Sequence, residues 1–190
     1  MDEQKQLENV MNKYKRIFII GHSGAGKGVL AQAVAKQLGW KFINADVLGC
    51  VACTGRRVSE ILGKDGERCF NQSLHQILQH QITQEDIVVT TDESIVCDQT
   101  TRQLLKSEFT VYLQVSEKNQ SERLSGGYRP LLPVADYDAL LSALHQERND
   151  LYNDVASFTL SSDNGNIEEH ANSIIQALAV TETTDQAGSS

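Results

Sequence analysis

The stretch RIFIIGHSGAGKGVLAQAVAKQL, residues 16–38, decides the fold of this 190-residue chain. It opens on an apolar run, continues with a glycine-rich loop, and ends in a segment whose apolar residues recur at helical spacing. That order predicts a strand over Arg16–Ile20, a tight loop, and a helix over Lys27–Leu38. The loop sequence GHSGAGK matches the pattern GxxxxGK, which is typical of a phosphate-binding loop between a strand and a helix.

The glycines of this loop are the reason why we expect it to bind phosphate. Gly21, Gly24 and Gly26 let the backbone turn tightly and bring its N–H groups close to phosphate oxygens. The helix start adds its positive end, and Lys27 is placed to reach the β- and γ-phosphates. We expect the His22 side chain to face solvent. The predicted nucleotide contacts in the loop are Gly21, His22, Ser23, Gly24, Ala25, Gly26, Lys27, Gly28 and Val29.

The bulk composition is that of one soluble domain. With 40% apolar and 22% charged residues the chain is ordinary for a globular protein, and its net charge of −8 argues against a nucleic-acid partner. The apolar runs fall far short of the ~18 residues of a membrane span. We expect a cytoplasmic monomer with a single domain over residues 1–180 and a disordered polar tail over 181–190.

The four cysteines fit a reducing compartment. Cys50, Cys53, Cys69 and Cys97 are expected to be reduced thiols packed as small apolar residues. Cys50 and Cys53 have the spacing of half a zinc site, but no second CxxC or CxxH follows, so a metal or redox role is disfavoured.

Short apolar runs alternate with amphipathic segments along the whole chain, which predicts βαβ units and a parallel sheet. The predicted strands are Arg16–Ile20, Trp40–Asn44, Asp86–Thr91, Phe109–Gln114 and Phe158–Ser161. The predicted helices are Lys27–Leu38, Val58–Leu62, Gly66–Gln79, Gln99–Lys106, Glu117–Leu124, Asp136–Val155 and Asn166–Ala179, with a short helix over Leu7–Lys15 left open. The glycines between Ser125 and Tyr128 predict a mobile lid.

Beyond the loop, the chain resembles the shikimate kinase family over almost all of residues 16–178. KFINADVL…TGRRVSEILGKDGERCFNQSL is similar to that family's FxDxDxxIExxTGxxIxEIFxxxGExxFRxxE. FTVYLQV, SERLSGGYRPLL and HQERNDLYNDVASFTL then follow in the family's order and spacing. The resemblance implies a P-loop kinase fold, α/β with a five-stranded parallel sheet flanked by helices and a short lid. It also implies transfer of the γ-phosphate of ATP to a hydroxyl of a small molecule.

The resemblance assigns roles to single residues. Asp46 matches the carboxylate that faces the acceptor hydroxyl, which it orients and from which it accepts a proton. Lys27 and Arg129, the latter in the lid, match residues that offset charge on the transferring phosphate. Arg123 matches an arginine that packs on the nucleotide base. Arg148 matches an arginine that clamps a substrate carboxylate.

Several positions differ from the family, and they are positions that contact magnesium or the substrate in that family. Gly28 and Asn44 replace groups that support magnesium. Asn71 replaces a clamp arginine, and Leu74 replaces a nearby glutamate. Asp92-Glu93-Ser94 replaces a triple glycine that lets shikimate approach the backbone. These changes argue against shikimate as the acceptor more strongly than against nucleotide binding.

Some features offer compensation. GAGKG also resembles the adenylate kinase loop, where glycine follows the lysine and magnesium is held mainly through waters and phosphates, although Val29 stands where that family has threonine. IVVTTDE resembles a Walker B element, so Asp92 or Glu93 is a candidate magnesium ligand, with a solvated acidic turn as the equal alternative. Arg68 is a candidate substitute for the lost clamp, with a surface pair to Asp65 or Glu67 as the alternative.

The predicted function is therefore that of a small-molecule kinase that uses ATP and Mg²⁺. The alternative is a nucleotide-binding protein without kinase activity, acting as a sensor or interaction module, because Gly28 and Asn44 are both changed on the magnesium side.

Overall fold

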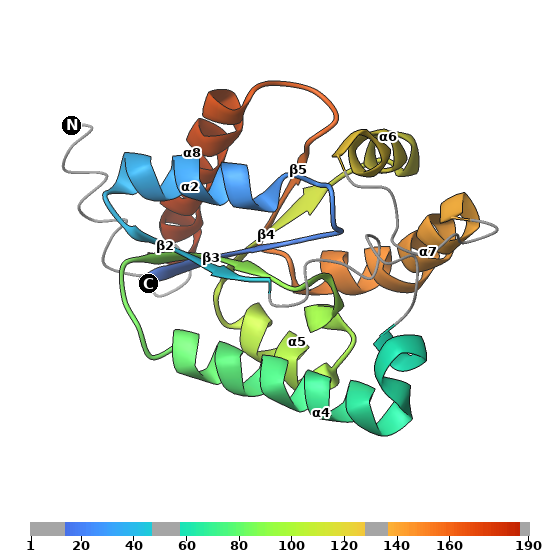
Figure 1. Cartoon of the computed structure of the whole chain (residues 1–190). Coiled ribbons are helices and arrows are strands. Elements are labelled where there is room, and N and C mark those ends of the chain that lie inside the picture. The colour runs from blue at the N-terminus through green and yellow to red at the C-terminus, as the bar shows by residue number, and fades with distance from the viewer. Residues whose placement is uncertain (1–13, 47–57, 128–136, 187–190) are drawn as a thin grey trace.

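The protein is a three-layer α/β structure built on one parallel sheet (Figure 1), here as a computed structural model that describes residues 14–46, 58–127 and 137–186. The five strands lie in the order β2-β3-β1-β4-β5. They are β1 (Arg16–Ile20), β2 (Lys41–Ala45), β3 (Ile87–Thr91), β4 (Phe109–Gln114) and β5 (Phe158–Ser161). The helices are α2 (Lys27–Leu38), α4 (Val58–Gln81), α5 (Gln99–Lys106), α6 (Glu117–Gly127), α7 (Tyr137–Val155) and α8 (Ile167–Gln186), with a 3₁₀ turn η1 (Glu93–Val96).

The central strand β1 explains why the apolar runs of the sequence are continuous rather than alternating. Ile17 and Ile19 point into a core made with α2 and α8, whereas Phe18 and Ile20 point into a second core made with α4, α5 and α7. Figure 1 shows these two helical layers on opposite faces of the sheet. A parallel strand that is covered on both faces has no solvent-facing side, so every position is apolar.

The predicted sheet and its strands are confirmed, with shifts of one residue at the ends of β2 and β3. The two helices predicted over 58–62 and 66–79 form one segment, α4, with a kink at Gly63. Gly63 has φ 71° and ψ 172°, a conformation that glycine adopts without a Cβ clash. The turn η1 was not predicted; only Asp92, its N-cap, separates it from the buried strand β3.

Three other predictions need correction. Helix α6 runs to Gly127, so the first part of the predicted lid is helical; Tyr128 lies outside the described residues. Helix α8 runs to Gln186, so the predicted disordered tail begins within a helix. Cys69 and Cys97 are free, as expected, but exposed rather than packed. Cys50, Cys53 and residues 7–13 of the optional N-terminal helix lie outside the described residues.

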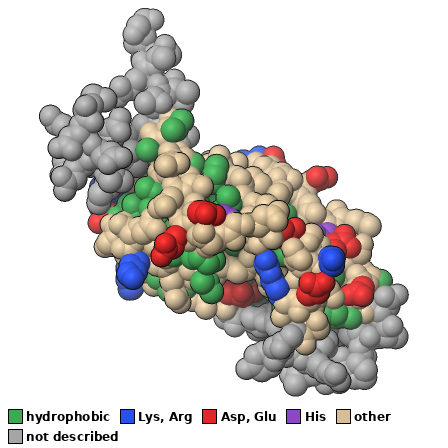
Figure 2. Space-filling view, turned by 90° about the horizontal axis from the view of Figure 1, so that it is seen from above, with side chains coloured by type: hydrophobic (Ala, Val, Ile, Leu, Met, Phe, Trp, Pro, Cys, Tyr) green, Lys and Arg blue, Asp and Glu red, His purple; other side chains and the backbone are tan. Residues whose placement is uncertain are grey.

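Two surface features of the described residues bear on membranes and charge. None of the described helices combines the length and the apolar character that a membrane span requires. Figure 2 views the molecule from the α2 side and shows acidic and basic side chains interspersed on that face, without a basic stripe among the residues drawn in colour.

Gly21 joins β1 to the loop at the closest backbone approach of this region. Its φ is 140°, and a Cβ built there would lie 2.5 Å from the carbonyl oxygen of Leu113 in β4. Gly28, seven residues later, is in the first turn of α2, and a Cβ there would have nothing within 4 Å. An added methyl group would therefore clash with the backbone at Gly21, whereas it would fit into open space at Gly28.

We expect Gly21→Ala to lower the free energy of unfolding by about 2 kcal/mol or more, because both the strained backbone and the clash oppose a side chain. Gly28→Ala is the matched control and should raise it by about 0.5–1 kcal/mol through helix propensity. Urea denaturation of both variants measures the difference. Equal stability of the two variants would contradict this account of the loop.

Candidate active site

The loop between β1 and α2 presents an uncapped helix start at the carboxyl edge of the sheet. Gly26 precedes α2 in the left-handed conformation, with φ 95°, and no side chain caps the helix. The first turn also contains no acidic residue. Because the first N–H groups of a helix have no partner within the helix, this start is a ready site for the oxygens of a phosphate.

Lys27 is held inside the loop. The side chain is buried, with Nζ donating to the carbonyl oxygen of Gly21 at 2.9 Å and to that of His22 at 3.1 Å. The two carbonyls fix the ammonium group within the turn of backbone that follows β1. A phosphate bound by the loop would therefore meet a positive charge that is already in place.

His22 does not face solvent, and that prediction is wrong. Its side chain is fully buried, with Nε2 2.8 Å from Oδ1 of Asn149 and its ring stacked on that of His145 at 4.0 Å. Burial, with the charges of His145, Arg148 and Lys27, lowers the pKa of His22 to about 3, although the Asn149 hydrogen bond opposes the shift. The imidazole is therefore neutral, and Nε2–H donates to Asn149.

A buried polar chain continues from His22 around the back of the loop. Asn149 Nδ2 lies 3.4 Å from Nδ1 of His145, and Nε2 of His145 lies 2.8 Å from Oε1 of Gln120. Gln120 is fully buried, and its Nε2 donates to the carbonyl oxygen of Ser23 at 2.9 Å. Burial also lowers the pKa of His145. We call His22, Asn149, His145 and Gln120 the backing chain, because it connects the loop to α7 and α6.

The three members of the backing chain outside the loop, Gln120, His145 and Asn149, were not predicted as site residues from the sequence. Apart from the contact between His145 and Asn149, their partners are 25 to 127 residues away in the chain, so no local pattern reveals them. One signal was available: His145, Arg148, Asn149 and Tyr152 recur at three- and four-residue spacing and so share one face of α7.

Glu93 lies between the loop and α7, and the alternative of a solvated acidic turn is wrong. The residue is only 2% exposed. Its Oε2 accepts from the backbone N–H of Ser23 at 3.1 Å, and its Oε1 lies 3.7 Å from Nη1 of Arg148. The Tyr152 hydroxyl donates to the Glu93 carbonyl at 2.5 Å. Arg148 is itself buried, and its Nε lies 3.6 Å from a carboxylate oxygen of Glu147.

The other residues predicted on the magnesium side are occupied within the chain. Asp92 caps η1, where its Oδ1 accepts from the N–H of Ser94 at 2.9 Å and from its hydroxyl at 2.6 Å. Asn44 Oδ1 accepts from the Thr90 hydroxyl and from the Asp46 N–H, each at 3.0 Å. Among the residues that the structure describes, no group of three or more His, Cys, Asp or Glu side chains is arranged to hold a metal ion.

The predicted base and the predicted arginines lie at different places. Asp46 directly follows β2, at the same edge of the sheet as the loop. Arg123 donates to the carbonyl oxygens of Gly24 at 3.1 Å and Ala25 at 3.3 Å, so it supports the loop from the side of α6. Arg129 lies outside the described residues.

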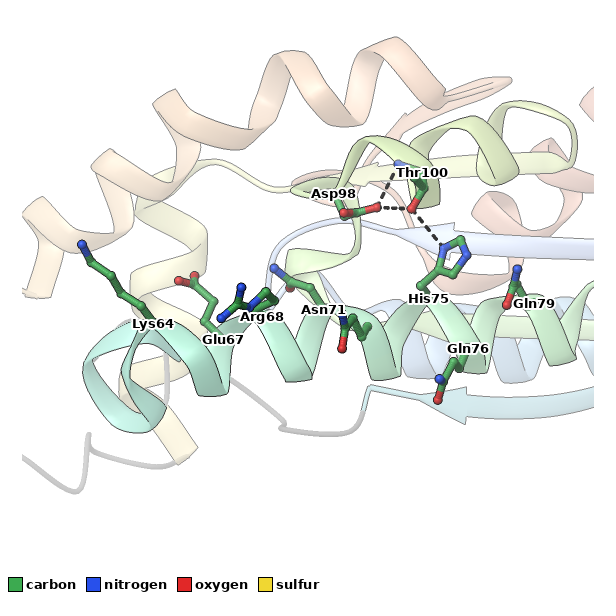
Figure 3. A pocket seen from close by; sticks show the side chains of 10 residues that line it. Lys64, Glu67, Arg68, Asn71, His75, Gln76, Gln79, Asp98 and Thr100 are labelled. Atoms are coloured by element: carbon green, nitrogen blue, oxygen red, sulfur yellow. Dashed lines mark hydrogen bonds between the residues drawn. The ribbon is translucent and has the colours of Figure 1, made fainter.

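Arg68 lies in a separate, polar pocket on α4 and pairs with Asp65, which was the alternative for this residue. The pocket has a volume of about 680 Å³, and Figure 3 shows Arg68 and Asn71 on one of its walls. Across it, the Thr100 hydroxyl lies 3.2 Å from Nδ1 of His75. The lining residues are Lys64, Glu67, Arg68, Asn71, Gln72, His75, Gln76, Gln79, Asp98 and Thr100. Since the phosphate loop contributes none of them, Arg68 is not brought together with Lys27.

A glycine-rich loop with an internal lysine, set between the central parallel strand and an uncapped helix, defines the class of P-loop nucleotide-binding kinases. The shikimate kinase family model matches residues 23–179, and the chain belongs to that family. Both the fold and the family are as the sequence predicted. Membership supports nucleotide binding and the use of ATP.

Individual relatives agree with this assignment. The chain is 31% identical over 168 residues to the shikimate kinase of Legionella pneumophila (strain Corby), covering 87% of this chain and 95% of that protein. It is 32% identical over 171 residues to the shikimate kinase of Actinobacillus succinogenes, covering 88% and 97%. The solved shikimate kinase from Acinetobacter baumannii, in complex with shikimate, matches with a TM-score of 0.74 and 26% identity over 92% of this chain and 98% of that one. A gluconokinase from Sinorhizobium meliloti 1021 shares the fold, with a TM-score of 0.60 and 20% identity over 94% and 99% of the two chains.

The buried His22 predicts a specific loss of stability in acid. An unfolded histidine titrates near 6.5, whereas the pKa of His22 in the folded protein is about 3. Between those values the unfolded state binds a proton that the folded state does not, so the free energy of unfolding falls as the pH falls. From about pH 7 to pH 5 the expected loss from His22 alone is about 2 kcal/mol.

Urea denaturation at several pH values tests this expectation. His22→Gln should make the dependence of stability on pH shallower between pH 7 and pH 5, whatever its effect on stability at pH 7. His80→Gln removes an exposed histidine in the last turn of α4 and is the control. Identical pH slopes for the wild type and His22→Gln would show that His22 does not titrate in this way.

Proposed function

We propose that the protein is an ATP-dependent kinase that phosphorylates a hydroxyl group of a small molecule. One observation carries the proposal: Lys27 and Asp46 follow the carboxyl ends of β1 and β2, which flank β3 in the same parallel sheet. In open α/β sheets this edge is where ligands bind. The two groups that phosphoryl transfer requires, a phosphate-binding lysine and a carboxylate for the nucleophile, therefore lie at one edge.

The proposed reaction uses the residues of this edge as follows. The loop and Lys27 bind the phosphates of ATP and offset their charge. Asp46 orients the acceptor hydroxyl and takes its proton as the oxygen forms a bond to the γ-phosphorus. The bond from the γ-phosphorus to the bridging oxygen breaks, and ADP leaves with that oxygen. Arg123 supports the loop, and Arg129 in the lid is proposed to cover the transferring group.

The described residues do not fit a magnesium ion held by protein side chains. Gly28 has no hydroxyl, and Oδ1 of Asn44 and Oδ1 of Asp92 accept hydrogen bonds from the chain itself. Oε2 of Glu93 accepts from Ser23, and its Oε1 faces the charge of Arg148 at 3.7 Å. Magnesium usually keeps several waters and binds through substrate phosphates, so the predicted ligands Asp92 and Glu93 are not part of this proposal.

The same observations favour a second candidate function, nucleotide binding without phosphoryl transfer. A protein of this kind needs the loop and Lys27 but neither a magnesium site nor a base. It would bind ATP and ADP with little dependence on magnesium, and substitution of Asp46 would leave every measured property unchanged.

Turnover on a panel of acceptors tests the kinase proposal. With sugars, sugar acids, cyclitols and nucleosides as acceptors, we expect ADP formation that depends on one acceptor class. Asp46→Asn should lower kcat by about 10²-fold or more while leaving the Kd of ATP unchanged, because the carboxylate acts on the acceptor. Lys27→Met should weaken ATP binding and abolish turnover.

Asp154→Asn, which removes an exposed carboxylate paired with Lys106, is the control for Asp46→Asn and should be neutral. Coupled ADP detection and phosphorus NMR of the product measure the outcome. ATP binding without turnover on any acceptor, together with an inert Asp46→Asn variant, would reject the kinase in favour of the second candidate.

Gly28 offers a direct test of the missing magnesium ligand. A Cβ at this position meets nothing within 4 Å, so a serine fits without rearrangement. We expect Gly28→Ser to increase the effect of magnesium on the Kd of ATP about tenfold, because it restores a hydroxyl beside Lys27. Gly28→Ala has the same helix effect without the oxygen and should not. Isothermal titration with and without magnesium compares the variants; equal behaviour of serine and alanine would contradict the expectation.

A further inference from the structure

Glu93 and Arg148 form a buried ion pair directly behind the phosphate loop. Both side chains are almost fully buried, at 2% and 6% exposure, and Glu93 also accepts from the Ser23 N–H in the loop itself. The acceptor of the proposed kinase must bring its hydroxyl to the γ-phosphate, which the same loop binds. The charges of Glu93 and Arg148 therefore influence whether a charged or an uncharged acceptor binds. This inference rests on the proposed function.

The cations that the structure places against the loop are all engaged. Lys27 donates to the carbonyl oxygens of Gly21 and His22, and in the proposed kinase it binds the phosphates of ATP. Arg123 donates to loop carbonyls and to Ser162. Arg148 faces two carboxylates, those of Glu93 and Glu147. An acidic acceptor would find no uncompensated cation among these residues, and beside Arg148 it would also meet the charge of Glu93.

The geometry of the pair suits an uncharged hydroxyl instead. The 3.7 Å between Oε1 of Glu93 and Nη1 of Arg148 is too long for a hydrogen bond, and neither atom has another hydrogen-bond partner in the described structure. A buried donor and a buried acceptor that both lack partners are costly. A hydroxyl group accepts from one and donates to the other, which a carboxylate cannot do.

We propose that Glu93 determines acceptor specificity. Its carboxylate takes the place beside Arg148 that an acidic substrate would need, so the kinase phosphorylates an uncharged polyhydroxyl compound and rejects acids. Arg148, which the family resemblance assigns to a substrate carboxylate, is neutralised from within the chain.

Matched acceptors that differ only in the carboxylate test the proposal. Suitable pairs are shikimate with its methyl ester, and gluconate with glucitol. For the wild type we expect kcat/KM to favour the uncharged member by about tenfold or more. Glu93→Gln keeps the shape and the bond from Ser23 but removes the charge, and should reduce this preference by about tenfold, mainly through a lower KM for the acid.

The control is a second buried ion pair, remote from the loop. Glu108 binds Arg16 at 3.0 Å at the start of β1, the end opposite to Gly21. Glu108→Gln removes the charge of a similarly buried pair and should leave the acceptor preference unchanged. A wild type that prefers the acid, or a preference that survives Glu93→Gln, would overturn the proposal. The comparison of acidic and uncharged acceptors on the wild type needs no variant. A preference for the acid would overturn the proposal even where Glu93→Gln does not fold.

A binding measurement separates this proposal from the proposed kinase activity. Glu93→Gln leaves Arg148 facing only the partly exposed carboxylate of Glu147, so acetate at millimolar concentration should raise the melting temperature of this variant relative to chloride. It should do so neither for the wild type nor for the double variant Glu93→Gln/Arg148→Gln. Absence of stabilisation would overturn the role of Glu93 even if the kinase is active. Stabilisation without turnover on any acceptor would support that role and reject the kinase.

Discussion

The phosphate loop is buried on the side that faces the protein, where its polar groups need partners from the chain, although Nδ1 of His22 has none among the described residues. The Ser23 N–H donates to Glu93 and the Ser23 carbonyl accepts from Gln120. His22 bonds to Asn149, which also accepts from Tyr112. An unpaired buried polar group costs as much as a lost hydrogen bond, or more. Satisfying this loop therefore dictates residues on α6, α7, β4 and η1 that are distant in sequence.

The sequence predicts the parts of the structure that local physics controls. Continuous apolar runs identify the buried parallel strands, and the glycines of the loop identify the turn that β1 must make. The break between the helices predicted over 58–62 and 66–79 is likewise confirmed, because the backbone is non-helical at Gly63. The length of α8 was missed, since a polar composition does not by itself end a helix.

The site was predicted less well than the fold, for a physical reason. His22 and Glu93 are polar residues at the ends of strands, where exposure is the usual outcome. Both are buried against side chains of α7, which lie 55 to 127 residues away in the chain. The family resemblance identified Arg148 as part of the site. It did not show that Glu93, at a glycine position of the family, would approach Arg148 to 3.7 Å.

Helix α7 connects the two halves of the site. Its buried face carries His145 and Asn149, which hold the loop, and Arg148 and Tyr152, which hold Glu93. Because these residues share one face of a rigid helix, the loop and Glu93 cannot shift relative to each other without breaking bonds to the same element. A substitution of Glu93 therefore alters the hydrogen bond that the Ser23 N–H of the phosphate loop donates to it. Glu93, one of the positions at which this chain differs from the family, therefore belongs to the same hydrogen-bonded unit as the phosphate loop.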